Sequence, residues 1–267
     1  MTDGMGTALI TGASSGIGAV YADRLARRGH DLVLVARDKA RLDALAAHLA
    51  AETGRTVDVL RADLTDAADL AAVERRLAED ASISLFVNNA GMSLSGDLLS
   101  AEGDEITRLI ALNVTAPTRL AAVAGRAFAE RKSGAIVNIA SVLGLVVERF
   151  DGAYNGTKAH LLTVSRWLGA QLADRGVYVQ AVLPAATRTE IWERSGKDVD
   201  ALPPESVMSV DDLVDAALIG FDRREAVTIP PLADEGLWQA YDAARQAMLP
   251  GFGTGTPAPR YRETVAA

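Results

Sequence analysis

Short β-type runs alternate with longer helical patterns along most of the chain, and this alternation limits the fold more than any other feature of the sequence. Several of the short runs are almost continuously apolar, such as DLVLV at residues 31–35, which is typical of parallel strands covered on both faces. The connections between runs are short, so right-handed crossovers are expected. We therefore predict an α/β fold with a doubly wound, mostly parallel seven-stranded sheet and helices on both faces.

The pattern places each expected element in a defined range. Strands are expected at residues 7–11, 31–35, 56–60, 84–88, 135–139, 177–183 and 226–229. Helices are expected at residues 16–28, 38–53, 66–80, 105–131, 153–175 and 211–223. No interior linker or internal repeat stands out, so residues 1–250 are expected to form a single domain.

Two segments break the alternation. The tail at 251–267 is rich in Gly, Pro and Thr and is expected to be loose. Residues 190–210 follow the sixth strand and contain Trp192 and two consecutive prolines. Because parallel sheets bind ligands beyond the carboxyl ends of their strands, we expect this segment to be a loop or helix on the substrate side.

Composition excludes several classes of protein. The chain of 267 residues has no cysteine, which rules out disulfides, thiolate metal sites and cysteine nucleophiles, and its three histidines are scattered, so no metal site is expected. A formal charge of −8 argues against a nucleic-acid partner, which needs a basic surface. No apolar run approaches the roughly 20 residues of a membrane helix, and the amino end lacks a signal-peptide pattern. We expect a soluble, cytoplasmic protein with no membrane partner.

A glycine-rich turn, TGASSGIG at residues 11–18, links the first strand to the first helix. Its first glycine permits the tight turn, the second lets a pyrophosphate approach the backbone, and the third lets helix and strand pack closely. Unpaired N–H groups at the helix N-terminus attract phosphate. The turn predicts nucleotide binding rather than an ordinary structural turn. Its candidate contacts are Gly12, Ser14, Ser15, Gly16, Ile17 and Gly18.

Arg37 follows the second strand, at the position where nucleotide-binding folds of this kind place the side chain that contacts the cofactor ribose. An acidic side chain there would hold a ribose 2′-hydroxyl, but this chain has Ala36 and then Arg37. A guanidinium can bind a 2′-phosphate through two parallel hydrogen bonds, which favours NADP(H) over NAD(H). The alternative is a solvated arginine partly neutralised by Asp38.

Tyr154 and Lys158 lie four residues apart at the start of a helical stretch, which puts both side chains on one helix face. A nearby ammonium lowers the pKa of a phenol and makes it a usable general acid. Ser141 ends the fifth strand, where its hydroxyl can orient a substrate carbonyl. Each feature alone is weak, because the spacing is common and a serine often begins a loop.

Asn113 lies at an inward position of its helix, and Pro117 follows four residues later. Because proline has no N–H, the helix should be disturbed there, and the Asn113 carbonyl is available to a water that serves proton transfer. A kinked helix with a locally satisfied asparagine is an equally good interpretation of the spacing alone.

Taken together, these motifs resemble the compact branch of the short-chain dehydrogenase/reductase family over residues 7–230, and more loosely the DltE-like bacterial reductases. The resemblance implies a Rossmann fold that binds NADP(H) and a catalytic tetrad of Asn113, Ser141, Tyr154 and Lys158. It also implies assembly as a homodimer or homotetramer through the two long helices at 105–131 and 153–175. Further cofactor contacts implied are Asp63 and Leu64 near adenine, Asn89, Ala90 and Gly91 along the cofactor, and Pro184, Thr187 and Thr189 after the sixth strand.

One departure concerns the segment after the sixth strand, where the family usually has Pro-Gly and this chain has Pro184-Ala185. Alanine tolerates a positive φ less well than glycine, so the placement of the nicotinamide is left open there. Gly156 is a second, smaller departure, because glycine is unfavourable inside the helix expected to carry Tyr154 and Lys158.

The expected function is an NADP(H)-dependent oxidoreductase that moves hydride between nicotinamide and a carbonyl or secondary alcohol, with Tyr154 as general acid or base. Ser141 would bind the substrate oxygen, and Lys158 would lower the tyrosine pKa and hold the ribose. The alternatives are a catalytically idle dinucleotide-binding sensor or scaffold, and an epimerase or dehydratase of the extended relatives, which Ser15 disfavours. Trp192 and residues 143–147 and 190–210 suggest a partly apolar pocket, but they do not identify the substrate.

Overall fold

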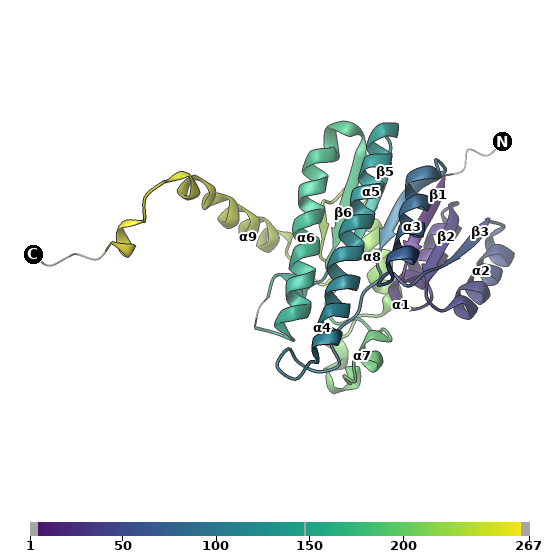
Figure 1. The fold of residues 1–267 in the computed structure, drawn as a ribbon, viewed down its shortest axis with the longest axis horizontal. Helices are drawn as coiled ribbons and strands as arrows, with labels where there is room; N and C mark the ends of the chain where they lie inside the picture. Colours follow the sequence, from purple (N-terminus) through teal and green to yellow (C-terminus); the bar gives the residue numbers. More distant parts are fainter. Residues whose placement is uncertain (1–4, 147, 263–267) are drawn as a thin grey trace, which may run out of the picture. The chain divides into compact units, whose positions relative to one another are not determined.

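The computed structural model describes residues 5–146 and 148–262 and contains a seven-stranded parallel sheet, as predicted (Figure 1). The strand order is β3-β2-β1-β4-β5-β6-β7, and every neighbouring pair is parallel. The strands are β1 (Thr7–Thr11), β2 (Asp31–Ala36), β3 (Val57–Arg61), β4 (Ile83–Asn88), β5 (Gly134–Ile139), β6 (Val177–Val182) and β7 (Val227–Thr228).

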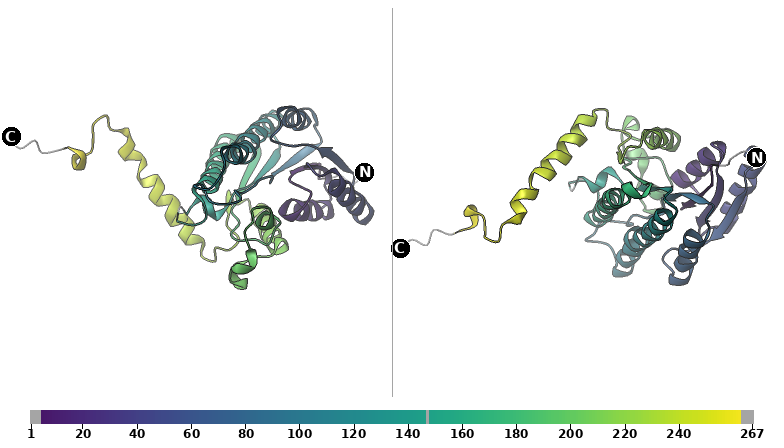
Figure 2. Two further views of the ribbon diagram at one scale, coloured as in Figure 1. Left: turned by 60° about the horizontal axis from the view of Figure 1, so that its bottom comes forward. Right: turned by 90° about the horizontal axis from the view of Figure 1, so that it is seen from above.

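Two layers of helices cover the sheet (Figure 2). One layer contains α1 (Gly16–Arg27), α2 (Lys39–Thr53) and α8 (Val210–Asp222), and the other contains α3 (Ala67–Glu79), α5 (Ala116–Arg131) and α6 (Gly152–Leu172). Successive residues of β1 alternate between the layers, since Leu9 is buried on the α3/α5 side and Ile10 on the α1/α8 side. This two-sided burial explains why the strands are almost continuously apolar.

The strand order reverses between β1 and β4, which places the turns after these two strands on either side of a crevice. The glycine-rich turn follows β1, and the NNAG sequence begins at the end of β4. Ligands of doubly wound sheets bind at this position. The fold therefore brings the predicted cofactor residues to one edge.

The helix expected at 105–131 is interrupted. The structure has α4 (Gly103–Ile110), a π-helical turn at Ala111–Thr115, and then α5. Pro117 cannot donate the N–H that an α-helix would direct to the Asn113 carbonyl, and the chain accommodates this with a wider turn. The disturbance predicted near Asn113 is therefore observed, and it divides the helical stretch expected at 105–131.

The segment at 190–210 is a series of short turns rather than one helix. It contains α7 (Ile191–Arg194) and two 3₁₀ turns, Val199–Ala201 and Pro204–Ser206. An isolated bridge between Thr187 and Met208 closes the base of this segment. The segment is therefore pinned at both ends.

The chain divides into two compact units, Met1–Pro230 and Pro231–Ala267. The second unit contains a helix that the sequence pattern did not reveal, α9 (Glu235–Ala247). Two 3₁₀ turns, Leu249–Gly253 and Pro259–Tyr261, lie in or reach into the tail expected at 251–267. Val147 and the last residues of that tail lie outside the described residues. Within residues 5–146 and 148–262, no helix is long and apolar enough to cross a membrane.

Candidate active site

The glycine-rich turn forms a close cradle at the start of α1. Gly12 and Gly16 have φ angles of +67° and +54°, a region that favours glycine. A Cβ added at Gly18 would collide with the Gly12 carbonyl oxygen and approach Asn89 Nδ2 to 2.7 Å. Ser15 precedes the helix in an extended conformation, so the first N–H groups of α1 are available to a phosphate.

Thr11 and Asn89 tie the two turns of the crevice together. The Thr11 hydroxyl accepts hydrogen bonds from the backbone N–H groups of Asn89 and Ala90 at 3.0 and 3.1 Å. In the other direction, the Asn89 amide donates to the Thr11 carbonyl at 2.9 Å. Asn89 and Ala90 are thus part of the crevice wall, but the Asn89 amide is used to hold the turn in place.

Arg37 lies at the end of β2 beside Asp63, with its Nη1 4.0 Å from Asp63 Oδ2. The guanidinium is half exposed, and the long distance to Asp63 leaves it able to bind an anion. Burial opposes ionisation of Asp63, but hydrogen bonds from Thr65 and the charge of Arg37 lower its pKa. Leu64 is buried in the core, so the expected adenine contact of this residue can only come from its main chain.

Gly91 brings two of the catalytic candidates together. A Cβ added there would lie 3.3 Å from Asn113 Oδ1 and 3.7 Å from Lys158 Nζ. Asn113 is buried in the π-helical turn, where its amide donates to the Met92 carbonyl at 2.7 Å and its Oδ1 accepts from the Met92 N–H at 2.9 Å. The Asn113 side chain therefore fixes the chain after β4, which is a role the sequence did not indicate.

Lys158 is buried and donates to the Ile139 carbonyl at 2.9 Å, at the carboxyl end of β5. Burial lowers its pKa to about 8, because a desolvated ammonium is disfavoured. Its Nζ lies 5.5 Å from the centre of the Tyr154 ring. The predicted helical spacing thus brings the two side chains together on α6.

Burial raises the pKa of Tyr154, and the charge of Asp151 adds to this effect. This is opposite to the lowering expected from Lys158. The ammonium lies over the tyrosine ring and is committed to the Ile139 carbonyl, so desolvation of the phenol outweighs it. In this geometry Tyr154 keeps its proton at neutral pH.

Ser141 lies just after β5, where its hydroxyl donates to the Pro184 carbonyl at 3.2 Å and accepts from the Leu143 N–H at 3.1 Å. Gly144, three residues later, allows this segment to pack on α6, since a Cβ there would lie 2.9 Å from the Lys158 carbonyl carbon. Ser141 is therefore held between the Lys158 helix and the segment after β6. Ala185 has no positive φ, so the missing glycine places no strain on this backbone.

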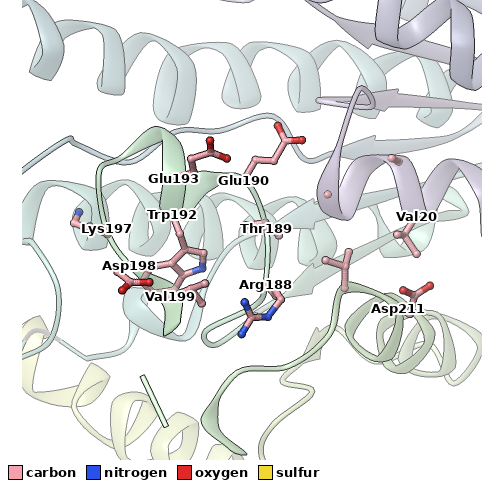
Figure 3. A pocket seen from close by; sticks show the side chains of 13 residues that line it. Val20, Arg188, Thr189, Glu190, Trp192, Glu193, Lys197, Asp198, Val199 and Asp211 are labelled. Atoms are coloured by element: carbon pink, nitrogen blue, oxygen red, sulfur yellow. The ribbon is translucent and has the colours of Figure 1, made fainter. Parts of the chain in front are cut away.

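Thr187 and Thr189 lie in the segment that follows Pro184, and their side chains have different surroundings. The buried Thr187 hydroxyl donates to the Ala185 carbonyl, and the Thr187 carbonyl accepts from the Trp192 indole at 2.8 Å. Thr189 faces the glycine turn, with its Cγ2 3.4 Å from the position of a Cβ on Gly16. Thr189 borders a cavity of 720 Å³ together with Trp192 and Lys197 (Figure 3).

Three residues near Tyr154 were not predicted from the sequence. Asp151 caps the N-terminus of α6, and its side chain accepts from the Tyr154 N–H at 2.7 Å. Phe150 has a φ of +68° and stacks at a tilt on Tyr154, with ring centres 5.3 Å apart. Lys197 lies over the Phe150 ring at 3.9 Å. Asp151 three residues before the tyrosine is a recognisable helix-capping signal, whereas the contacts of Lys197 depend on long-range folding.

Residues 6–200 match a family model described as short chain dehydrogenase. The chain belongs to the short-chain dehydrogenase family. It is similar to a short-chain dehydrogenase from Sphingobium yanoikuyae, solved in complex with NADPH, with 58% identity, a TM-score of 0.94, and coverage of 97% of this chain and 100% of that one. The family prediction is thereby confirmed, and the expected NADP(H) agrees with the cofactor of this relative.

A second solved structure, the bulky-bulky ketone specific alcohol dehydrogenase from Comamonas testosteroni, is 52% identical with a TM-score of 0.90, covering 97% of this chain and 99% of that one. The very-long-chain 3-oxoacyl-CoA reductase of Anas platyrhynchos is 30% identical over 203 residues, 74% of this chain and 65% of that protein. This chain therefore spans less than two thirds of that reductase. As a short-chain dehydrogenase, the protein is an oxidoreductase, and the sensor or scaffold alternative is not favoured.

Proposed function

We propose that this short-chain dehydrogenase transfers hydride between NADP(H) and a ketone or secondary alcohol with bulky apolar substituents. The observation that carries the proposal is that Asn113 and Lys158 lie against Gly91, with the Tyr154 ring 5.5 Å from Lys158 Nζ, in a sheet whose glycine cradle lies at the switch point. An idle dinucleotide-binding protein would need the cradle but would have no use for a buried tyrosine–lysine pair.

The cradle fits a dinucleotide, because Gly12 and Gly16 adopt left-handed φ angles and Gly18 has no Cβ that would collide with the Gly12 carbonyl, so the turn packs tightly at the start of α1. The residues that would hold NADP(H) are those of the turn, Arg37 at the 2′-phosphate, and the segments at 89–91 and 184–189. When bound, NADPH supplies the hydride. The NADPH complex of the 58% identical relative supports this choice of cofactor.

Tyr154 would hold the proton that the carbonyl oxygen receives. Burial raises its pKa, which keeps the hydroxyl protonated at neutral pH but also makes it a weaker acid, so release of the proton depends on the groups around it. Lys158, with a pKa of about 8, stabilises the phenolate that remains after proton transfer. Ser141 would donate its hydroxyl hydrogen to the same substrate oxygen in exchange for the Pro184 carbonyl, and Asn113 would keep the wall of the site in position through Met92. A water on the Asn113 main-chain carbonyl, freed by Pro117, would connect Lys158 to solvent.

The aromatic character of the site supports a bulky substrate. Phe150 contacts both Tyr154 and Trp192, with ring centres 5.3 and 6.3 Å away. Such a wall favours large apolar substituents over small or charged ones. The 52% identical relative named for bulky-bulky ketones supports the same class.

We also propose that residues 5–230 form the catalytic domain of a cytoplasmic homodimer or homotetramer assembled through α5 and α6. The exposed Trp167 on α6, with 61% of its surface accessible, supports an interface on this face.

The proposed substrate class is tested by the rate of NADPH oxidation with acetone, acetophenone and a diaryl ketone. We expect kcat/KM to rise along this series and to be lost for each ketone in Tyr154→Phe. The highest kcat/KM with acetone would refute the apolar wall, and an unchanged rate in Tyr154→Phe would refute the acid role.

A further inference from the structure

Lys197 occupies a position that the catalytic scheme does not use. It is one of only four lysines in the chain, and it lies in the segment after β6. Its Nζ donates to the Ser93 hydroxyl and to the Leu94 carbonyl, both at 3.1 Å. These partners belong to the loop after β4, so a single ammonium joins two of the loops that border the site.

The same ammonium also approaches Asp151, in the segment that directly precedes α6. The Asp151 side chain is 2% exposed, and its Oδ2 has no hydrogen-bond partner among the described residues. Lys197 Nζ lies 3.9 Å from this oxygen. A buried carboxylate is costly without a counter-charge. The Lys197 ammonium therefore stabilises Asp151, which caps the helix that carries Tyr154.

Phe150 contacts both Lys197 and Tyr154, and its backbone is strained. Its φ of +68° is rare for a bulky residue, and a strained residue beside a catalytic helix points to a functional constraint. The conformation places its ring 3.9 Å below Lys197 Nζ and 5.3 Å from the Tyr154 ring. Lys197 and Tyr154 thus contact the same aromatic side chain.

We propose that Lys197 is a positioning residue that fastens the segment after β6 over the active site and thereby sets the shape of the aromatic wall for bulky substrates. It acts through Asp151, Phe150 and the loop at 93–94, and it touches neither the reacting carbonyl nor the cofactor. The Lys197 backbone N–H also donates to the Trp192 carbonyl at 2.9 Å, so the main chain that carries the indole is tied to the main chain of the lysine. The inference rests on the proposed reduction of ketones.

The test compares Lys197→Met, which keeps the apolar stem and removes the charge, with a control, Lys132→Met, at an exposed lysine just before the amino end of β5. We expect KM for the diaryl ketone to rise about tenfold or more in Lys197→Met. KM for acetone and the affinity for NADPH, measured by calorimetry, should change less than about twofold. Lys132→Met should behave as the wild type.

Hydrogen exchange of residues 187–199 provides a readout that does not depend on turnover. The exchange of this segment should accelerate in Lys197→Met and stay unchanged in Lys132→Met. If Lys197→Met does not fold, the double variant Lys197→Met with Asp151→Asn removes both charges together and carries the same test, because an asparagine side chain can still cap α6.

The proposal is overturned if exchange is unchanged, or if KM rises equally for acetone and the diaryl ketone, which indicates a structural role alone. A wild-type enzyme that reduces no ketone with NADPH refutes the proposed function instead, and the exchange experiment then still decides whether Lys197 fastens the segment.

Discussion

The buried Lys158 makes the free energy of unfolding depend on pH in a predictable direction. Its pKa is about 8 in the folded protein, against 10.5 for an ordinary lysine. Between these values the unfolded chain binds more protons than the folded one, so this group's contribution to stability rises with pH. Below about pH 8 both states are protonated, and the cost of burying the charge is present in full.

Lys158→Met removes that cost at every pH. The difference between the two pKa values corresponds to about 3 kcal/mol. The stability of Lys158→Met relative to the wild type should therefore fall by about 3 kcal/mol as the pH rises from about 8 to about 10.5. The lost hydrogen bond to the Ile139 carbonyl adds an offset that does not vary with pH, so the slope and not the offset is the test.

Urea unfolding of both proteins between about pH 7 and about pH 10 measures this slope. Lys132→Met, which changes an exposed lysine, serves as the control and should show a constant difference from the wild type. A constant difference between Lys158→Met and the wild type over the same range would refute the conclusion that the ammonium is desolvated.

Three further substitutions test the cofactor site, the packing of the glycine-rich turn and the stability of α6. Arg37→Ala should weaken NADPH binding about tenfold or more and NADH binding much less, because one charge-assisted contact to phosphate is lost; equal losses in calorimetry would contradict the 2′-phosphate role. Gly18→Ala should reduce the free energy of unfolding by about 2 kcal/mol, since its Cβ would collide with the Gly12 carbonyl. Gly156→Ala has open space around it and should stabilise α6 by about 1 kcal/mol; urea unfolding that reverses the order of these two variants would contradict the packing argument.

The sequence predicts the parts of the molecule that follow from periodicity and from strand ends. All seven strands and the six long helical regions lie close to their expected positions, because each contains its own apolar pattern. The cofactor candidates and Ser141 lie at the carboxyl ends of the strands because parallel strands end on one side of the sheet, whereas the other catalytic candidates are supplied by the π-helical turn and by α6. Gly91 was expected along the cofactor, and the structure adds that it lies against both Asn113 and Lys158.

What escaped prediction depends on three-dimensional surroundings. The direction of the Tyr154 pKa is set by burial and by Asp151, and neither is visible in the spacing of Tyr154 and Lys158. The contacts of Lys197 with Ser93 and Leu94 join residues about a hundred positions apart. The positive φ of Phe150 is similarly invisible, because phenylalanine does not normally signal a left-handed turn.

A single turnover of enzyme with pre-bound NADPH and a diaryl ketone tests the central claim most directly, because it isolates the chemical step from cofactor exchange. The wild type should oxidise its bound NADPH, whereas Tyr154→Phe should bind NADPH with unchanged affinity and oxidise it at least about a hundredfold more slowly. Equal rates in the two proteins would contradict the assignment of Tyr154 as the proton donor.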